Sequence, residues 1–420
     1  MMMAADTPHV VVVGGGFGGL YATRTLARRP VRITLVDRRN HHLFQPLLYQ
    51  VATAVLNPAD IATPLRSIVR RLKQVSVILA EVEKVDLAGR RVALDRGEMT
   101  YDALILAAGA SHSYFSHDEW ELLAPGLKTL EDALEIRRRV LLAYELAERE
   151  TDGAERQALL TFVVIGGGPT GVELAGALAE ISRQTIARDF RAIDPTKARI
   201  VLLEGGPRIL PTFPEDLAAS ADAQLRRLGV EVKTNSVVTR VTPDAVWVGG
   251  QQVRARAVLW AAGVTASPLA RTLGVPLDRA GRVIVEPDLS IPGHPDAFAI
   301  GDLSCFMHQT GDPLPGLAPV ALQQGRAAAE NVWSRLRGEP TAPFRYKDRG
   351  SMATIGRAAA VGVIGKLHLT GTMAWLAWLF VHVLLLIGFR NRFIVLFQWT
   401  WAYCSWQRGA RLITTAWRSR

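Results

Sequence analysis

Short apolar runs alternate with glycine-rich loops and helix-like stretches along most of the chain. The apolar run HVVVV at 9–13 is followed by a glycine loop, a helix-like stretch and a second strand that ends at Asp37. The same order returns where LTFVVI at 160–165 precedes a glycine loop, a helix-like stretch and the strand RIVLLE, which ends at Glu204. Units of this kind build parallel sheets covered by helices. The pattern predicts an α/β fold with two Rossmann-like βαβ units.

Both loops carry glycines in the spacing G-x-G-x-x-G, and both second strands end in an acid. In this motif the first glycine permits a tight turn, the second lets a pyrophosphate approach the backbone, and the third allows close helix–strand packing. The terminal acid accepts hydrogen bonds from a ribose. Two complete copies imply two bound dinucleotides, although a duplicated copy without function remains the alternative. The residues concerned are Gly14, Gly16, Gly19 and Asp37 in the first unit, and Gly166, Gly168, Gly171 and Glu204 in the second.

The second acid lies farther from its loop than the first. Asp37 follows Gly14 by 23 residues, whereas Glu204 follows Gly166 by 38. The polar stretch 182–197 has the composition of an insertion and explains the longer interval.

Other small-residue turns follow predicted strands, as expected near a bound cofactor. The strand ALIL at 103–106 leads to Gly109, and AVLW at 257–260 leads to Gly263. Near the C-terminal side, DAFAIG delivers Asp302 at a strand end, before a candidate helix over 319–336. Asp302 is placed to meet an extended dinucleotide held by the first loop. An ordinary turn aspartate is the alternative reading.

The C-terminal region is the most apolar and aromatic part of the chain. Residues 373–387 are apolar except for His382, and six of the ten tryptophans lie between 375 and 417. A helix of this length reaches about 22 Å at 1.5 Å per residue, short of the roughly 30 Å hydrocarbon core of a bilayer. We therefore predict two helices, about 373–388 and 391–406, that lie at a membrane interface. A short transmembrane hairpin and ordinary core helices remain alternatives.

The net charge of +10 is concentrated in this same region. Residues 337–420 contain 12 Lys and Arg against 2 Asp and Glu, which leaves 37 of each sign in the rest of the chain. Basic residues beside apolar ones suit an anionic lipid surface better than nucleic acid, for which a basic stripe on a soluble face is expected. A solvated basic tail without function is the alternative.

Cysteine and histidine usage argues against thiol and metal chemistry. Cys305 and Cys404 lie far apart, so no disulfide framework, close redox pair or zinc site is expected. His41 and His42 have no third ligand at a suitable spacing. The first ten residues lack the features of a secretion signal, so the body of the protein is expected in the cytosol.

The chain resembles flavoproteins of the glutathione-reductase type and, more narrowly, the type II NADH:quinone oxidoreductases. The narrower resemblance rests on HHLFQPLLYQVAT at 41–53, GGGPTGVELAGALAEI at 166–181, AFAIGD at 297–302 and LPGLAPVALQQGRAAAENV at 314–332. It implies FAD on the first loop and NADH on the second, with electrons passing to a membrane quinone without proton pumping. It also implies a homodimer on the cytoplasmic face of the cell membrane. The domains would be an FAD-binding domain at 7–125 and 286–340, an NADH-binding domain at 155–285, and a membrane-docking region at 341–420.

The resemblance also assigns roles to residues outside the loops. Glu173 matches the family's active-site acid, and Gln323 and Gln324 lie where the family binds quinone. Pro319 departs from the pattern, because it replaces the first glutamine of that motif and removes a hydrogen-bond donor. Glu204 would repel the 2′-phosphate of NADPH, although Arg208 is near enough in the sequence to oppose this preference.

Two other functions remain open from the sequence. One is a reductase of a soluble electron carrier such as ferredoxin or rubredoxin, and the other is a flavin-bearing redox sensor. Reduction of the flavin without any protein partner, followed by its reoxidation by quinone, would separate them from the leading hypothesis.

Overall fold

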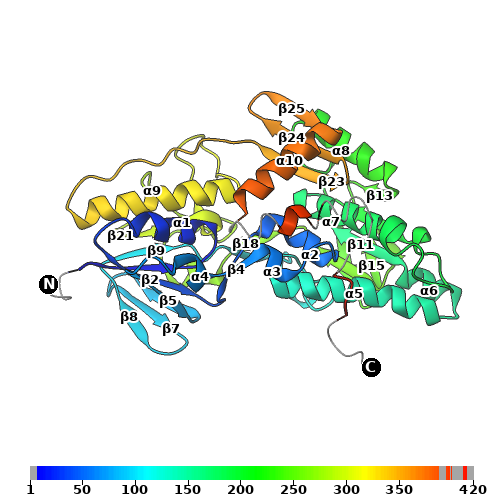
Figure 1. The fold of residues 1–420 in the computed structure, drawn as a ribbon, viewed down its shortest axis with the longest axis horizontal. Coiled ribbons are helices and arrows are strands. Elements are labelled where there is room, and N and C mark those ends of the chain that lie inside the picture. The colour runs from blue at the N-terminus through cyan, green and yellow to red at the C-terminus, as the bar shows by residue number, and fades with distance from the viewer. Residues whose placement is uncertain (1–6, 387–393, 398, 400–409, 414–420) are drawn as a thin grey trace. The chain divides into compact units, whose positions relative to one another are not determined.

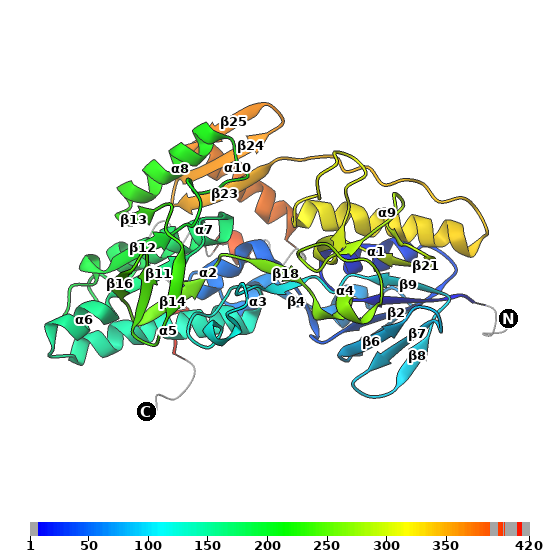
Figure 2. The same ribbon diagram turned by 180° about the vertical axis from the view of Figure 1, so that it is seen from behind.

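The computed structural model describes residues 7–386, 394–397, 399 and 410–413 of the 420-residue chain. The chain forms two compact units (Figures 1 and 2). The first comprises Met1–Leu43, Ala62–Ser111 and Val264–Asp348, and the second comprises Phe44–Ile61, His112–Gly263 and Arg349–Arg420.

These units differ from the predicted domain boundaries. Residues 44–61 belong to the second unit although they follow the first glycine loop closely, and 264–285 belong to the first. From Arg349 onward, the residues that the structure describes group with the second unit.

The first unit is built on a six-stranded sheet with the order β20-β21-β9-β1-β2-β5. Strands β21, β9, β1, β2 and β5 are parallel, and β20 is antiparallel to β21. Val10, Val11 and Val12 are fully buried, as expected for a strand covered on both faces. The strands are β1 (His9–Val13), β2 (Arg32–Asp37), β5 (Val75–Leu79), β9 (Ala103–Leu106), β20 (Ser290–Ile291) and β21 (His294–Ala299).

Two helices of the first unit pack closely on each other. They are α1 (Phe17–Leu26) and α9 (Ala318–Leu336), and α9 confirms the helix predicted over 319–336 (Figure 1). A Cβ on Gly325 would lie 2.3 Å from the carbonyl oxygen of Gly18. Only glycine therefore fits where the two backbones meet.

Smaller elements complete the first unit. Strand β3 (His41–Leu43) pairs with β4 (Ala62–Pro64), and β10 (Ala110–His112) pairs with β18 (Val264–Ala266). Strands β6 (Val82–Asp86), β7 (Arg91–Leu94) and β8 (Glu98–Thr100) form an antiparallel sheet, and β19 (Val283–Ile284) pairs with β22 (Ser304–Cys305). The short helices are α4 (Leu65–Val69), η5 (Pro268–Thr272) and η6 (Gly301–Leu303).

The second unit contains a parallel sheet with the order β13-β12-β11-β17. Its strands are β11 (Thr161–Ile165), β12 (Arg199–Leu203), β13 (Val230–Lys233) and β17 (Ala257–Trp260), beside an antiparallel sheet of β14 (Val238–Val241), β15 (Ala245–Val248) and β16 (Gln251–Arg254). The helices are α2 (Leu48–Ala52), α3 (Pro58–Ile61), α5 (Leu130–Arg149), α6 (Gly153–Leu159), α7 (Pro169–Glu180) and α8 (Glu215–Arg227). Short turns η1 (Gln45–Leu47), η2 (Asp118–Trp120), η3 (Ile181–Thr185) and η4 (Pro195–Lys197) link them. Two βαβ-based parallel sheets thus confirm the predicted fold class.

The C-terminal part of the second unit is an antiparallel sheet followed by a helix. Strands β23 (Ser351–Gly356), β24 (Ala359–Ile364) and β25 (Leu367–Thr370) lead into α10 (Gly371–Leu385). Helix α10 confirms the first predicted C-terminal helix. The second, predicted over 391–406, lies mostly outside the described residues, although residues 394–397 are described and are helical. In the part of the chain that the structure describes, no helix has both the length and the apolar character needed to cross a bilayer.

Candidate functional site

The first glycine loop has the geometry that its motif predicts. Gly14 has φ = +101°, and a Cβ there would lie 2.3 Å from the Ala107 carbonyl oxygen. A Cβ on Gly19 would lie 1.8 Å from the Gly14 carbonyl oxygen. Gly16 instead faces open space, and α1 begins at the next residue. The N–H groups in the first turn of a helix have no partner within that helix, and such a turn at the end of a glycine loop is an arrangement that binds phosphate.

The second loop repeats this geometry in the second unit. Gly166 has φ = +109°, and its Cβ would lie 2.5 Å from the Ala261 carbonyl oxygen. A Cβ on Gly171 would lie 1.8 Å from the Gly166 carbonyl oxygen, while Gly168 faces open space. Because every distinctive contact is kept, the second copy shows no loss of the geometry that a dinucleotide needs.

The acids at the ends of β2 and β12 hold the two loops. Asp37 Oδ2 accepts a hydrogen bond from the Gly15 amide at 2.5 Å, and Oδ1 accepts one from Arg39 at 2.7 Å. Glu204 Oε2 accepts from the Gly167 amide and Oε1 from the Gly206 amide, both at 2.6 Å. Each carboxylate oxygen keeps a second acceptor site, so both acids can also receive a ribose hydroxyl.

Arg208 does not offer a free cation beside Glu204. Its guanidinium donates hydrogen bonds to the carbonyl oxygens of Phe213 at 2.9 Å and Pro211 at 3.0 Å. The guanidinium of Arg208 is thus hydrogen-bonded to backbone carbonyl groups in the turn after β12. No hydrogen bond or ion pair between Arg208 and Glu204 is found among the described residues.

The two predicted glycine turns have different surroundings. Gly109 has φ = +71° and open space where a Cβ would be, and its carbonyl oxygen accepts a bond from Ser267 N. A Cβ on Gly263 would meet the Phe115 ring at 2.8 Å. Gly263 therefore allows a close backbone approach, whereas Gly109 provides a conformation with positive φ.

Asp302 lies in η6, directly after β21, as predicted. A Cβ on Gly316 would lie 3.2 Å from Asp302 Oδ1, so the loop before α9 comes close to this carboxylate. The preceding residue, Gly301, has φ = +67° and donates its amide hydrogen to Gln324 Oε1 at 2.7 Å. Gln324 also accepts a bond from Ser304 Oγ at 3.3 Å and is only 1% exposed. Its amide therefore fixes the turn that carries Asp302.

Gln323, the neighbouring glutamine, forms two hydrogen bonds to the backbone of a residue far along the chain. Its Nε2 donates to the Lys347 carbonyl oxygen and its Oε1 accepts from the Lys347 amide, both at 3.0 Å. Pro319 occupies the first turn of α9, where a missing N–H breaks no helical hydrogen bond. The structure thus places all three predicted quinone-site residues at the start of α9.

The segment 339–348, here called the return segment, runs back from the end of α9 (Figure 1). Asn331 exchanges two hydrogen bonds with Ala342, and Gln309 exchanges two with Tyr346. The return segment is not part of a β-sheet, and several of its backbone N–H and C=O groups are hydrogen-bonded by the amide side chains of Asn331, Gln309 and Gln323 instead. The sequence does not predict these bonds, because each joins residues that are far apart along the chain.

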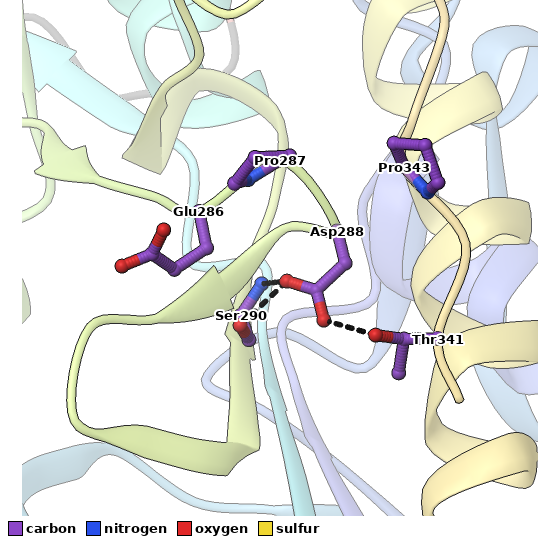
Figure 3. Close-up of a pocket in the computed structure, with 6 residues that line it drawn as sticks. All are labelled: Glu286, Pro287, Asp288, Ser290, Thr341 and Pro343. Carbon is purple, nitrogen blue, oxygen red and sulfur yellow. Dashed lines mark hydrogen bonds between the residues drawn. The ribbon is translucent and has the colours of Figure 1, made fainter. Parts of the chain in front are cut away.

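A surface pocket of about 320 Å³ lies where the return segment meets β20 (Figure 3). Asp288 Oδ1 accepts bonds from the Ser290 amide at 3.0 Å and from Ser290 Oγ at 2.5 Å, and its Oδ2 accepts from Thr341 Oγ1 at 2.7 Å. Burial opposes ionisation of Asp288, but these bonds lower its pKa below the usual value. Its carboxylate is thus used to anchor the return segment. The lining residues are Glu286, Pro287, Asp288, Ser290, Thr341 and Pro343.

Glu173 lies on α7 near the second loop. Although a small part of its side chain remains accessible to water, burial raises the pKa of its carboxyl to about 8. A long hydrogen bond of 3.4 Å from the Thr354 amide to Oε1 opposes this shift. Glu173 therefore keeps its proton in much of the population at neutral pH, and can donate a hydrogen bond or release a proton there.

The cysteine and histidine residues outside the loops differ in their surroundings. Cys305 is buried, and burial raises the pKa of its thiol, while Cys404 lies outside the described residues. His42 is buried beneath the first loop and contacts Gly15, which the sequence did not indicate. Among the described residues, no group of His, Cys, Asp and Glu is arranged to hold a metal ion.

Comparison with known proteins agrees with this geometry. The pyridine nucleotide-disulphide oxidoreductase family model matches residues 8–325, and that of the NDH2 C-terminal domain matches 349–404. The chain is 45% identical to the type II NADH:quinone oxidoreductase NdhA of Mycobacterium tuberculosis, over 97% of this chain and 89% of that protein. A type II NADH:quinone oxidoreductase of Staphylococcus haemolyticus is 30% identical over 89% of this chain and 93% of its own length.

A solved structure shares the fold at low sequence identity. It is NDH2 from Plasmodium falciparum in complex with NADH, which has a TM-score of 0.88 at 20% identity and covers 98% of this chain and 100% of its own. Family models, sequence relatives and fold therefore agree along nearly the whole chain. The chain belongs to the type II NADH:quinone oxidoreductase family.

Proposed function

We propose that this protein is a membrane-associated flavoenzyme that oxidises NADH and reduces a membrane quinone without pumping protons. The observation that carries the proposal is the pair of intact glycine loops on one chain whose relatives are type II NADH:quinone oxidoreductases over nearly its whole length. When bound, FAD accepts the hydride of NADH and passes two electrons to the quinone.

The first unit is the proposed FAD site. Gly14 makes the tight turn of the loop, Gly16 lets the pyrophosphate approach the backbone, and Gly19 allows α1 to pack against the strand. Asp37 receives the adenosine ribose. Asp302, in the turn fixed by Gln324, meets the middle of the cofactor, and Gly109 gives the turn after β9 its positive φ. This assignment follows the predicted FAD-binding domain at 7–125 and 286–340.

The second unit is the proposed NADH site, within the predicted domain at 155–285. Gly166 makes the tight turn, Gly168 lets the pyrophosphate approach the backbone, and Gly171 allows close helix packing. Gly263 belongs to the turn after β17, and Glu204 receives the ribose. Glu173 is the proposed acid, since its raised pKa lets it hold or release a proton near neutral pH. For the quinone we assign the start of α9. Gln323 and Gln324 hydrogen-bond to backbone there, and Pro319 lies in the first turn of the helix.

Replacing Glu204 with glutamine is expected to raise kcat/KM for NADPH relative to NADH by about tenfold. Glutamine keeps an oxygen acceptor for the Gly167 amide, gives up the acceptor of the Gly206 amide, and removes the charge that repels a 2′-phosphate. Steady-state rates with both nucleotides measure the ratio. Glu215→Gln, an exposed acid on α8, is the matched control. An unchanged ratio in Glu204→Gln would show that another group selects the nucleotide.

The membrane contact that we propose is one face of α10. Met373, Leu376, Phe380 and Leu384 are 48–67% exposed and recur at helical spacing, while Ala374 and Trp378 on the other side are buried. The turn between β24 and β25 adds exposed Ile364 and Leu367 beside Lys366. The excess of ten positive charges in 337–420 complements an anionic surface. The occupant of this face is therefore an anionic bilayer, on the cytoplasmic side of the cell membrane.

The double variant Leu376→Glu with Phe380→Glu is expected to lose most of its binding to anionic vesicles. Each substitution places a charge where an apolar side chain would enter the interface. Co-flotation with vesicles of anionic lipid measures the bound fraction, and NADH-dependent reduction of ferricyanide checks that the soluble half-reaction survives. Leu122→Glu, at an 81% exposed leucine of the second unit, is the control. Equal flotation of the double variant and wild type would exclude this face.

Quinone reduction itself is tested anaerobically. The purified flavoprotein is reduced with one equivalent of NADH and mixed with a water-soluble quinone while flavin absorbance is followed. Rapid reoxidation supports the proposed function. A flavin that is reduced by NADH but not reoxidised by quinone would contradict it and favour a soluble electron carrier or a sensor role. Sedimentation of the same sample tests the homodimer that we also propose.

A further inference from the structure

His42 is buried directly against the first glycine loop. It lies in the middle of β3, is 2% exposed, and its Nδ1 is 2.9 Å from the Gly15 carbonyl oxygen. The ring meets the ring of Phe17, the first residue of α1, edge to face at 5.1 Å. A carbonyl oxygen can only accept, so Nδ1 carries the hydrogen and Nε2 does not. Nε2 is buried without a hydrogen-bond partner among the described residues, and burial lowers the pKa of His42 to about 4.

This contact fixes the peptide that faces the proposed phosphate subsite. In a trans peptide the C=O and the following N–H point in opposite directions. Holding the Gly15 carbonyl on the His42 side therefore turns the Gly16 N–H away from His42. Gly16 is the residue that faces open space, just before α1. Asp37 holds the Gly15 amide at the same time, so both peptides of Gly15 are fixed.

The second loop provides an internal comparison within the same chain. Gly167 occupies the position of Gly15, and its amide is likewise held by an acid, Glu204. Its carbonyl oxygen also accepts a hydrogen bond, but the donor is the backbone amide of Leu210 at 2.7 Å. Both loops therefore require a donor on this carbonyl, and only the first obtains it from a side chain.

We propose that His42 is a positioning residue for FAD, whose Nδ1–H holds the Gly15–Gly16 peptide so that the Gly16 amide faces the pyrophosphate. The proposal rests on the proposed assignment of FAD to the first loop. It adds a residue outside the glycine motif and outside the strand-end acid to the binding of this cofactor. Because His42 touches the loop and not the reacting atoms, its effect should appear in cofactor affinity before it appears in chemistry.

The test is a set of substitutions in the full-length chain from which FAD has been removed. His42→Leu keeps bulk but removes the donor, and is expected to weaken FAD binding by about ten- to a hundredfold, as for a lost hydrogen bond that leaves a buried carbonyl unpaired. His42→Asn places an amide N–H near the position of Nδ1 and is expected to restore affinity to within about threefold of wild type. Titration with FAD, followed by flavin fluorescence, measures each dissociation constant.

Controls separate a positioning role from a general loss of structure. His41→Leu alters the neighbouring, partly exposed histidine of β3 and should leave FAD affinity unchanged. NADH affinity, which depends on the second loop, should be the same in all variants. If His42→Leu does not fold, the FAD affinity of His42→Ala is compared with that of His42→Asn, because alanine offers no donor.

The possible outcomes distinguish the proposed role of His42 from the assignment of FAD to the first loop, on which it rests. Equal FAD affinity in His42→Leu and wild type would overturn the role of His42, as would His42→Asn binding as weakly as His42→Leu. Failure of the wild-type chain to bind FAD at all would instead overturn the cofactor assignment.

Discussion

Replacing Gly176 with alanine is expected to lower the free energy of unfolding by about 3–5 kcal/mol, the range of the most damaging core substitutions. Gly176 lies on α7, and a Cβ there would be 1.7 Å from the carbonyl oxygen of Ile355 on β23. Both sides of this contact are backbone, so no side chain can move to make room. Helix α7 and the sheet β23–β25 must separate instead.

Two measurements together check this expectation. Thermal unfolding reports the loss of stability, and hydrogen exchange reports whether the amides of β23–β25 lose protection. The matched control is Gly153→Ala in α6, where an added Cβ meets nothing within 4 Å. That change should be neutral or slightly stabilising, because alanine lowers the entropy of the unfolded chain. A Gly176→Ala protein as stable as Gly153→Ala would mean that the helix and sheet are not packed as described.

Replacing Glu173 with glutamine is expected to stabilise the nucleotide-free protein by up to a few kcal/mol at pH 9, with little effect at pH 4.5. Burial raises the folded-state pKa of Glu173 from its ordinary value of 4.5 to about 8. As the pH rises from about 4.5 to about 8, the unfolded chain loses this proton and the folded chain keeps it. The wild type therefore loses stability across that window, and both states are ionised above it.

Urea unfolding at several pH values between 4.5 and 9 measures the difference between variant and wild type. The difference should grow through the window and then become constant. Glu145→Gln, at an exposed acid on α5, should show no such growth. A constant difference for Glu173→Gln at all pH values would show that Glu173 ionises normally in the folded protein.

The glycine loops could be predicted from the sequence because their requirements are local. Gly14 and Gly166 need positive φ, and Gly19 and Gly171 need the absence of a Cβ, within a few residues of one strand. The strand-end acids were equally predictable, even with the insertion before Glu204. Family resemblance then supplied the order of the two cofactors, which spacing alone did not.

The uses of Gln323 and Gln324 could not be predicted in this way. Their partners, Lys347 and Gly301, lie 24 and 23 residues away in the sequence, and nothing in a helix pattern points to them. The compact units also differ from the predicted domain boundaries. Residues 44–61 follow the first loop in sequence yet belong to the second unit, because the chain passes between the units more than once. Long-range pairing of this kind is set by packing and leaves little trace in local composition.

The different donors on Gly15 and Gly167 give the two loops different tolerance to mutation. Some single-base changes in a histidine codon, those to leucine and proline among them, give a residue without a side-chain donor. The amide of Leu210 survives every substitution except proline. The hydrogen bond from position 210 therefore does not depend on which side chain is present, whereas the bond from position 42 requires a side chain with a donor. Substitutions at position 42 should accordingly disturb the hydrogen bond to the first loop more often than substitutions at position 210 disturb the bond to the second.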